Sequence, residues 1–177
     1  KMNPVTSLLR LKVPHYKQGR LTDQQLLHFY GYIDGLRPNV RAAFYLMIGS
    51  GIRVSEVTNL TKADFSYEDG QLYIDIKNAK WKSDRRIPVV DRKAAQVVGE
   101  YVQSLDVTSQ PAFRMSKRTL QTYATNFTKR YGIPFHCHVL RHTFATLLME
   151  QGVTIEKIQY LLGHQSATMT RHYTQSA

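Results

Sequence analysis

The fold of this chain is decided near its C-terminal end, where residues 138–173 read HVLRHTFATLLMEQGVTIEKIQYLLGHQSATMTRHY. Apolar side chains recur there at helical spacing, and Gly152 and Gly163 interrupt the pattern. Thr154 and Ser166 stand where side-chain oxygens commonly cap helices. The pattern predicts three helices, over residues 138–152, 155–162 and 166–173.

The same stretch carries side chains that suit a phosphate group gaining charge. On a helix, His138, Arg141 and His142 lie on one face near the N-terminus, where free backbone N–H groups favour an anion. His164 follows the glycine that ends the second helix, and Tyr173, nine residues later, is a candidate nucleophile. The plainer interpretation is a solvated first turn with a core histidine, a loop histidine and a packing tyrosine.

Further toward the N-terminus, the sequence predicts more helices and a small sheet. Thr22 and Gln25 form a capping box at the start of the first helix. Helices are expected over residues 22–33, 38–48, 55–60, 91–105 and 116–131. Residues 72–76 alternate apolar and polar side chains, which is typical of a half-buried strand, and residues 85–90 can return beside it with Pro88 at an edge. The expected fold class is mainly α with a small antiparallel β-sheet (α+β).

The composition narrows the class of partner. Lys and Arg number 24 against 13 Asp and Glu, and the resulting net charge of +11 favours a polyanion, most often nucleic acid. A merely basic or ribosome-associated protein is the plain alternative, and an anionic membrane surface is a weaker one. No apolar run approaches the roughly 18 residues of a membrane span. Cys137 is the single cysteine, so no internal disulfide forms, and we expect a cytoplasmic location in the bacterial cytosol or nucleoid.

An arginine upstream extends the candidate site. Arg53 follows Gly-Ser-Gly-Ile at residues 49–52, and glycines let the backbone approach a ligand while arginine binds phosphate with two donors. Glu56 is placed to orient that guanidinium, although a plain surface ion pair has the same spacing. The His-Cys-His run at residues 136–138 is too crowded for a zinc site, and no nucleotide-binding motif occurs, so we expect no metal or other cofactor.

Four motifs together resemble the tyrosine recombinase (phage integrase) family. They are GIRVSEV at residues 51–57, followed by Leu60; HVLRHTFA at residues 138–145; LLGH at residues 161–164; and Tyr173 at the usual nucleophile spacing. Each motif alone is weak, but the four in this order are highly specific, and the likeness runs from about Thr22 to Gln175. The resemblance implies the catalytic-domain fold of that family and a site-specific DNA recombinase or integrase.

The resemblance also implies a role for each matching residue. Tyr173 attacks the scissile phosphate and forms a 3′-phosphotyrosyl link, which keeps the bond energy so that no ATP is needed. Arg53 and Arg141 bind the non-bridging oxygens, and their charge replaces that of a metal ion. His138 and His164 add hydrogen bonds, and His138 is also a candidate base for the tyrosine.

A lysine in the turn between the strands is implied as the acid that protonates the departing 5′-oxygen. Counting back eight residues from Pro88 reaches Lys80, which we prefer, whereas counting forward from Arg53 favours Lys77. Lys82 lies in the same turn. Contacts with DNA are expected from four side chains, namely Lys77, Lys82, Arg85 and His142.

The likeness further implies a larger protein and an assembly. Residues 1–20 are basic and irregular, and we expect them to be a linker from a missing N-terminal core-binding domain, with the catalytic domain at residues 21–177. The family norm is a homotetramer on paired double-stranded DNA sites, and the isolated domain can be monomeric. Phage, conjugative-element, transposon and Xer-type recombinases share these motifs. Competing functions are a type IB topoisomerase-like enzyme, a DNA-binding module without catalysis, and a metal-dependent nuclease that EDTA would inhibit.

Overall fold

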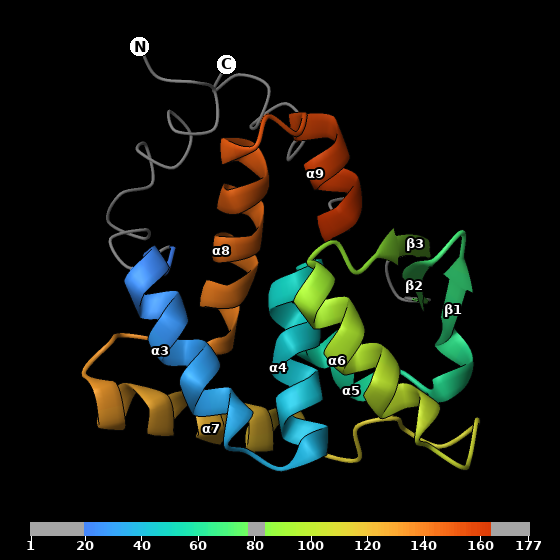
Figure 1. Cartoon of the computed structure of the whole chain (residues 1–177), viewed down its shortest axis with the longest axis horizontal. Helices are drawn as coiled ribbons and strands as arrows, with labels where there is room; N and C mark the ends of the chain where they lie inside the picture. The colour runs from blue at the N-terminus through green and yellow to red at the C-terminus, as the bar shows by residue number, and fades with distance from the viewer. Residues whose placement is uncertain (1–19, 78–83, 164–177) are drawn as a thin grey trace.

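Helix α4 (Pro38–Ser50) forms the centre of the domain (Figure 1). Its residues from Ala42 to Ser50 are all buried, as expected of a helix that is apolar on every side. The computed structural model describes residues 20–77 and 84–163, and predictions for residues 1–19, 78–83 and 164–177 lie outside it. The other helices it describes are α3 (Asp23–Asp34), α5 (Val54–Asn59), the short 3-10 helix η1 (Lys62–Asp64), α6 (Arg92–Gln103), α7 (Lys117–Tyr131), α8 (Cys137–Glu150) and α9 (Ile155–Leu162).

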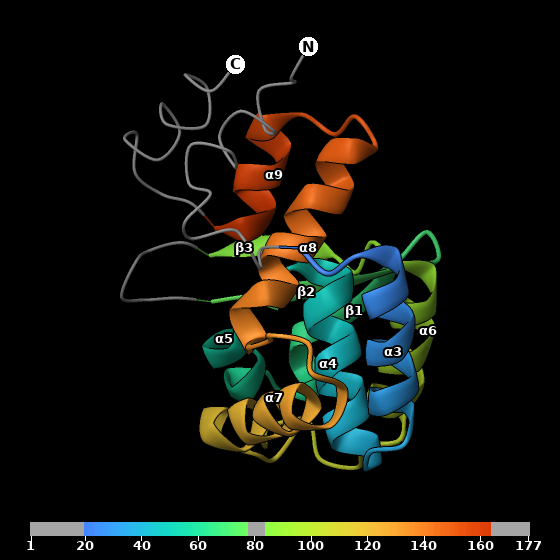
Figure 2. The same ribbon diagram turned by 90° about the vertical axis from the view of Figure 1, so that its left-hand side faces the viewer.

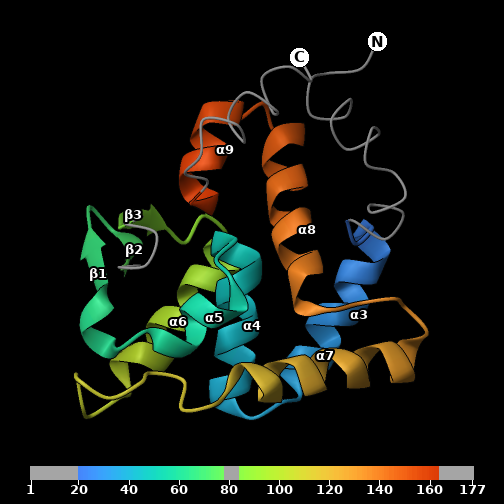
Figure 3. The same cartoon turned by 180° about the vertical axis from the view of Figure 1, so that it is seen from behind.

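Helix α7 crosses the base of the domain, beneath α3, α4 and α5 (Figure 3). Aromatic rings from three segments meet above it. The Phe29 ring lies 5.4 Å from that of Phe127 and 5.7 Å from that of Phe44, in edge-to-face arrangements that suit the ring quadrupoles. Phe135 packs against the same cluster, 5.2 Å from Phe127. This aromatic core holds α3, α4 and α7 together and anchors the start of α8.

A three-stranded antiparallel sheet flanks the helices, in the order β1 (Phe65–Glu68), β2 (Gln71–Ile76) and β3 (Arg85–Pro88). The inward residues of β2 are buried, as the alternating pattern predicts, and Ile74 of β2 pairs with Ile87 of β3. Strand β3 lies at the edge of the sheet and ends at Pro88, a position where a missing N–H is tolerated, and the next residue, Val89, still donates to the carbonyl oxygen of Leu72 at 2.9 Å. The sequence pattern missed β1, although Asp69 and Gly70, both with positive φ, form a two-residue hairpin turn that such a pair favours.

The sequence-based expectations for the helices are largely confirmed. The Thr22–Gln25 capping box is present, with the Gln25 N–H donating to Thr22 Oγ1 at 3.1 Å and the Thr22 N–H to Gln25 Oε1 at 2.9 Å. Helix α4 runs two residues past its expected end at residue 48, through Ser50, and Gly51 stops it in the left-handed conformation. A Cβ at Gly49 would collide with Ala94 of α6, so glycine lets these two helices pack closely there. The fold class is confirmed as mainly α with a small antiparallel sheet.

Helices α8 and α9 rise together at one end of the domain, and α9 stands over β3 (Figure 2). Thr154 caps α9 by accepting a hydrogen bond from the Lys157 N–H, and Gly163 ends the helix in the left-handed conformation. This arrangement brings the end of α9 near α5 and the start of β3. Within residues 20–77 and 84–163, no helix is long and apolar enough to cross a membrane.

Candidate active site

Arg53 stands at the junction of α4 and α5. Helix α4 ends at Gly51, whose φ of 76° is left-handed and where a Cβ would collide with the ring of Phe144 in α8. The glycine therefore lets α8 pack against this turn. Arg53 is the N-cap of α5, and its backbone N–H donates to Glu56 Oε1 at 2.8 Å. Its side chain is 38% exposed, so the guanidinium is anchored at its base and reachable from solvent.

Arg141, from the first turns of α8, connects this junction to α9. Its Nη1 donates to the carbonyl oxygen of Gly51 at 2.7 Å, and its Nη2 donates to that of Leu162 at 3.2 Å. Only 7% of the residue is exposed. One guanidinium thus ties the turn before Arg53 to the last turn of α9.

Glu56 and Arg85 form a buried ion pair beside these residues. Arg85 Nη1 lies 2.9 Å from Glu56 Oε2, and Nη2 lies 3.1 Å from Oε1. This two-donor geometry fixes the guanidinium plane relative to the carboxylate plane. Burial alone would raise the pKa of the Glu56 carboxyl, but the hydrogen bonds and charge of Arg85, together with the N–H and charge of Arg53, lower it. Glu56 was expected to orient the Arg53 guanidinium, yet that contact is longer, at 3.6 Å. The carboxylate mainly binds Arg85.

Arg85 is buried, whereas the predicted DNA contact requires an accessible side chain. Its side chain is 3% exposed, and both terminal nitrogens are used by Glu56. The physical reason is the strand period, because Arg85 points inward with Ile87 and Val89. That alternation is visible in the sequence and was the signal that could have identified an inward arginine.

Three histidine rings gather at the start of α8. The His138 and His142 rings lie 4.6 Å apart at right angles, and the His136 ring lies 6.3 Å from that of His138. Partial burial lowers the pKa of His138, and the neighbouring Arg141, His136 and Arg53 lower it further. His138 lies one helical turn before Arg141 on α8, and the lowered pKa favours its neutral ring at neutral pH.

The structure therefore ties Arg141 to the turn before Arg53, whose backbone N–H binds Glu56, and places His138 one helical turn before Arg141. Lys77 is exposed directly after β2. His142 is half-buried against His138, and its role in DNA contact stays a prediction. Four predicted residues, Lys80, Lys82, His164 and Tyr173, lie outside the described ranges.

Candidate metal ligands do not gather in the part of the chain that the structure describes. No group of three or more His, Cys, Asp or Glu side chains is placed there to hold a metal ion. The Cys137 thiol is buried, and burial raises its pKa to about 11, so it stays protonated at neutral pH.

Comparison with known proteins identifies the family. Residues 19–177 match the phage integrase family. This chain belongs to that family. It is 31% identical over 172 residues to the tyrosine recombinase XerA of Thermococcus onnurineus (strain NA1), covering 92% of the chain and 60% of that relative. It is 32% identical over 160 residues to the tyrosine recombinase XerC of Syntrophus aciditrophicus (strain SB), covering 80% of the chain and 50% of that relative.

Solved structures agree with this assignment. A crystal structure of XerA recombinase superposes with a TM-score of 0.72 at 25% identity, covering 88% of this chain and 57% of the XerA chain. The XerH recombinase bound to its difH substrate has the same TM-score at 24% identity, with 88% and 50% of the two chains covered, which shows the fold alone. The chain spans 50–60% of the length of the curated relatives named above.

Proposed function

We propose that this chain is the catalytic part of a site-specific DNA recombinase or integrase, which cleaves and rejoins strands through a 3′-phosphotyrosyl link. Membership of the phage integrase family and the net charge of +11 support a DNA substrate. The observation that carries the proposal is the contact of Arg141 with both the turn before Arg53 and the end of α9, with His138 one helical turn away on α8. Two guanidinium groups and a neutral imidazole suit a phosphate whose charge grows in the transition state.

The reaction balances without a cofactor. The Tyr173 oxygen bonds to phosphorus while the bond from phosphorus to the 5′-oxygen breaks. The phenolic proton passes to His138 or to water, and Lys80 gives a proton to the leaving 5′-oxygen. Attack by a 5′-hydroxyl on the phosphotyrosine reverses these steps and joins the strands. Arg53 and Arg141 supply the positive charge, with a hydrogen bond from His164, so we propose no requirement for metal or ATP.

The larger assembly is also a proposal. Residues 1–20 would link the catalytic domain, residues 21–177, to an N-terminal domain that grips the DNA from the other side. A lambda integrase tetramer bound to a Holliday junction shares the fold, with a TM-score of 0.62, and supports a homotetramer on paired DNA sites. We place the activity in the cytoplasm, where the protein meets chromosomal or phage DNA.

Covalent capture tests the proposal. The protein is incubated in EDTA with nicked duplexes that span the DNA flanking its gene, so that cleavage traps the covalent adduct. We expect a band that survives denaturation and carries DNA on Tyr173, and Tyr173→Phe should abolish it while DNA binding persists. A protein that binds these duplexes without forming an adduct would instead be a DNA-binding module. Cleavage that EDTA prevents would point to a metal-dependent nuclease.

Relaxation of supercoiled plasmid separates the recombinase from the topoisomerase-like alternative. A recombinase should require its own site and should join strands from two duplexes. Relaxation of plasmids that lack the site would favour the topoisomerase-like function.

A further inference from the structure

Arg85 contacts or adjoins three segments that carry proposed catalytic residues. Its Nη1 and Nη2 bind Glu56 at 2.9 and 3.1 Å, in the helical turn that begins at Arg53. Its Nε donates to the carbonyl oxygen of Leu161 in the last turn of α9, at 3.1 Å. Arg85 is also the first residue of β3, next but one to residues 78–83, which hold the preferred lysine. A single side chain thus joins α5, α9 and the start of β3.

Gly163 completes this contact. It ends α9 with a φ of 76°, and a Cβ there would lie only 2.7 Å from Cζ and Nη1 of Arg85. The missing side chain therefore lets the guanidinium cover the end of the helix. His164 is the next residue in the sequence, so the end of α9 determines where the chain toward His164 starts.

Directional contacts locate this helix end. The last carbonyl groups of a helix have no partner within it, and positive groups are favoured beside them. Here Arg85 binds the carbonyl of Leu161 and Arg141 binds that of Leu162. A buried ion pair adds little net stability compared with an apolar replacement, but its two-donor geometry is specific. The contacts of Arg85 therefore determine position more than stability.

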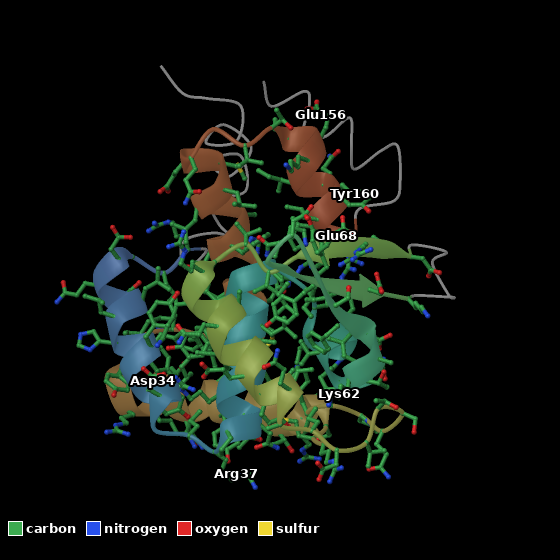
Figure 4. The ribbon with its side chains drawn as sticks, turned by 45° about the vertical axis from the view of Figure 1, so that its right-hand side comes forward. Asp34, Arg37, Lys62, Glu68, Glu156 and Tyr160 are labelled. Atoms are coloured by element: carbon green, nitrogen blue, oxygen red, sulfur yellow. The ribbon has the colours of Figure 1, made fainter. Side chains whose placement is uncertain are left out.

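We infer that Arg85 is a positioning residue for strand cleavage, an inference that rests on the function proposed above. It acts through its neighbours, by holding the end of α9 against the turn that carries Arg53. This contact would let His164, Arg53 and Arg141 bind the same phosphate group. Its sequence neighbour offers a contrast, since Arg86 faces outward beside Glu68, with its guanidinium 4.8 Å from the centre of the Tyr73 ring. Glu68 and Tyr160, both labelled in Figure 4, are each partners of Arg86, whose guanidinium pairs with Glu68 and whose backbone N–H donates to the Tyr160 hydroxyl at 3.4 Å.

The test combines Arg85→Met with Glu56→Gln, so that no unpaired charge stays buried. The wild type is the reference, and Arg86→Met is the control for loss of one positive charge on the same strand. The adduct-forming rate is measured at saturating protein on the nicked duplexes described above, beside the Kd for DNA and the melting temperature. We expect the double variant to keep the Kd and melting temperature of the reference and to cleave about 10²-fold more slowly, since a misplacement near 1 Å has that cost. Arg86→Met should cleave like the wild type.

The outcomes separate this inference from the proposed function. If Arg85 only balances a buried charge, the double variant will cleave at the wild-type rate, and the positioning role is overturned while the proposed function stands. If the wild type itself forms no adduct, both are overturned. A defect confined to DNA affinity would also overturn the positioning role, because a residue that sets geometry changes the rate and not the Kd.

Gly163→Ala provides a second route that leaves the charge of Arg85 in place. The new methyl group displaces the guanidinium, and we expect slow cleavage with DNA affinity retained. In the Arg85→Met/Glu56→Gln background, the same substitution should slow cleavage much less, because the side chain it displaces is already gone. Equal effects of Gly163→Ala in both backgrounds would show that the two residues act independently and would overturn the inference.

Discussion

Two buried regions of this domain are built on different physical principles. The aromatic core around Phe29 and Phe127 joins α3, α4 and α7 through apolar contacts that have little directional preference. The second region, which we call the polar junction, consists of Glu56, Arg85 and Arg141 and joins α5, β3, α8 and α9 through hydrogen bonds with defined geometry. The comparison suggests that the aromatic core provides stability, whereas the polar junction provides the position of the active site.

The largest effect on stability is expected from a substitution in the aromatic core. Phe127→Ala removes a fully buried ring and should lower the free energy of unfolding by about 3–5 kcal/mol. Denaturant unfolding measures this loss, and Leu27→Ala, at a side chain that is 72% exposed, is the matched control. At a temperature where the variant is still folded, its single-turnover cleavage rate should match the wild type. Slow cleavage by the folded variant would remove the distinction between the two regions.

The second-largest effect is expected from replacing Arg53, a charged side chain next to the polar junction, without disturbing the fold. Arg53→Ala should slow cleavage by about 10²–10³-fold, the cost of losing one donor to a charged transition state. Because the Arg53 side chain is partly exposed and its ion pair is long, the melting temperature should hardly change. Arg37→Ala is the control for charge, since Arg37 lies at the opposite end of the domain from α9 (Figure 4). Near-normal cleavage by Arg53→Ala would contradict its proposed role.

A smaller effect concerns the pH dependence of cleavage. Burial, Arg141, His136 and Arg53 lower the pKa of His138, so the neutral ring that can accept a proton is present at neutral pH and is lost as the pH falls through that lowered value. The second-order cleavage rate at low DNA concentration reports groups of the free enzyme, and its acid limb should lie below the usual histidine range. His138→Gln should remove this limb. A limb at or above the usual range would mean that another group accepts the proton.

The smallest effect concerns a local helix cap that neither region depends on. Thr22→Ala breaks the capping box of α3 and should cost about 1 kcal/mol of stability, with cleavage unchanged. Thermal unfolding measures the loss. Thr125→Ala, at an exposed mid-helix position on α7, is the control and should not destabilise the protein. A Thr22→Ala protein as stable as the wild type would show that packing alone determines where α3 begins.

The sequence was sufficient for features that depend on neighbouring residues. The caps Thr22, Asp91 and Thr154 and the helix stop at Gly163 occur where the pattern predicts them, because a cap is a contact within one turn. The buried face of β2 follows from a period of two. The family assignment also came from motifs that can be read along the chain, and the match over residues 19–177 confirms it.

Only the tertiary structure decided how the site is held together. The alternation along β3 points the Arg85 side chain inward, but no sequence pattern names its partners. Its partners Glu56 and Leu161 are 29 and 76 residues away, and no local pattern encodes such contacts. The sequence alone determined which residues are present and which elements carry them. Folding determined that Arg53 stays partly exposed and that Arg85 binds Glu56 and Leu161, because these contacts depend on what packs against each side chain from distant parts of the chain.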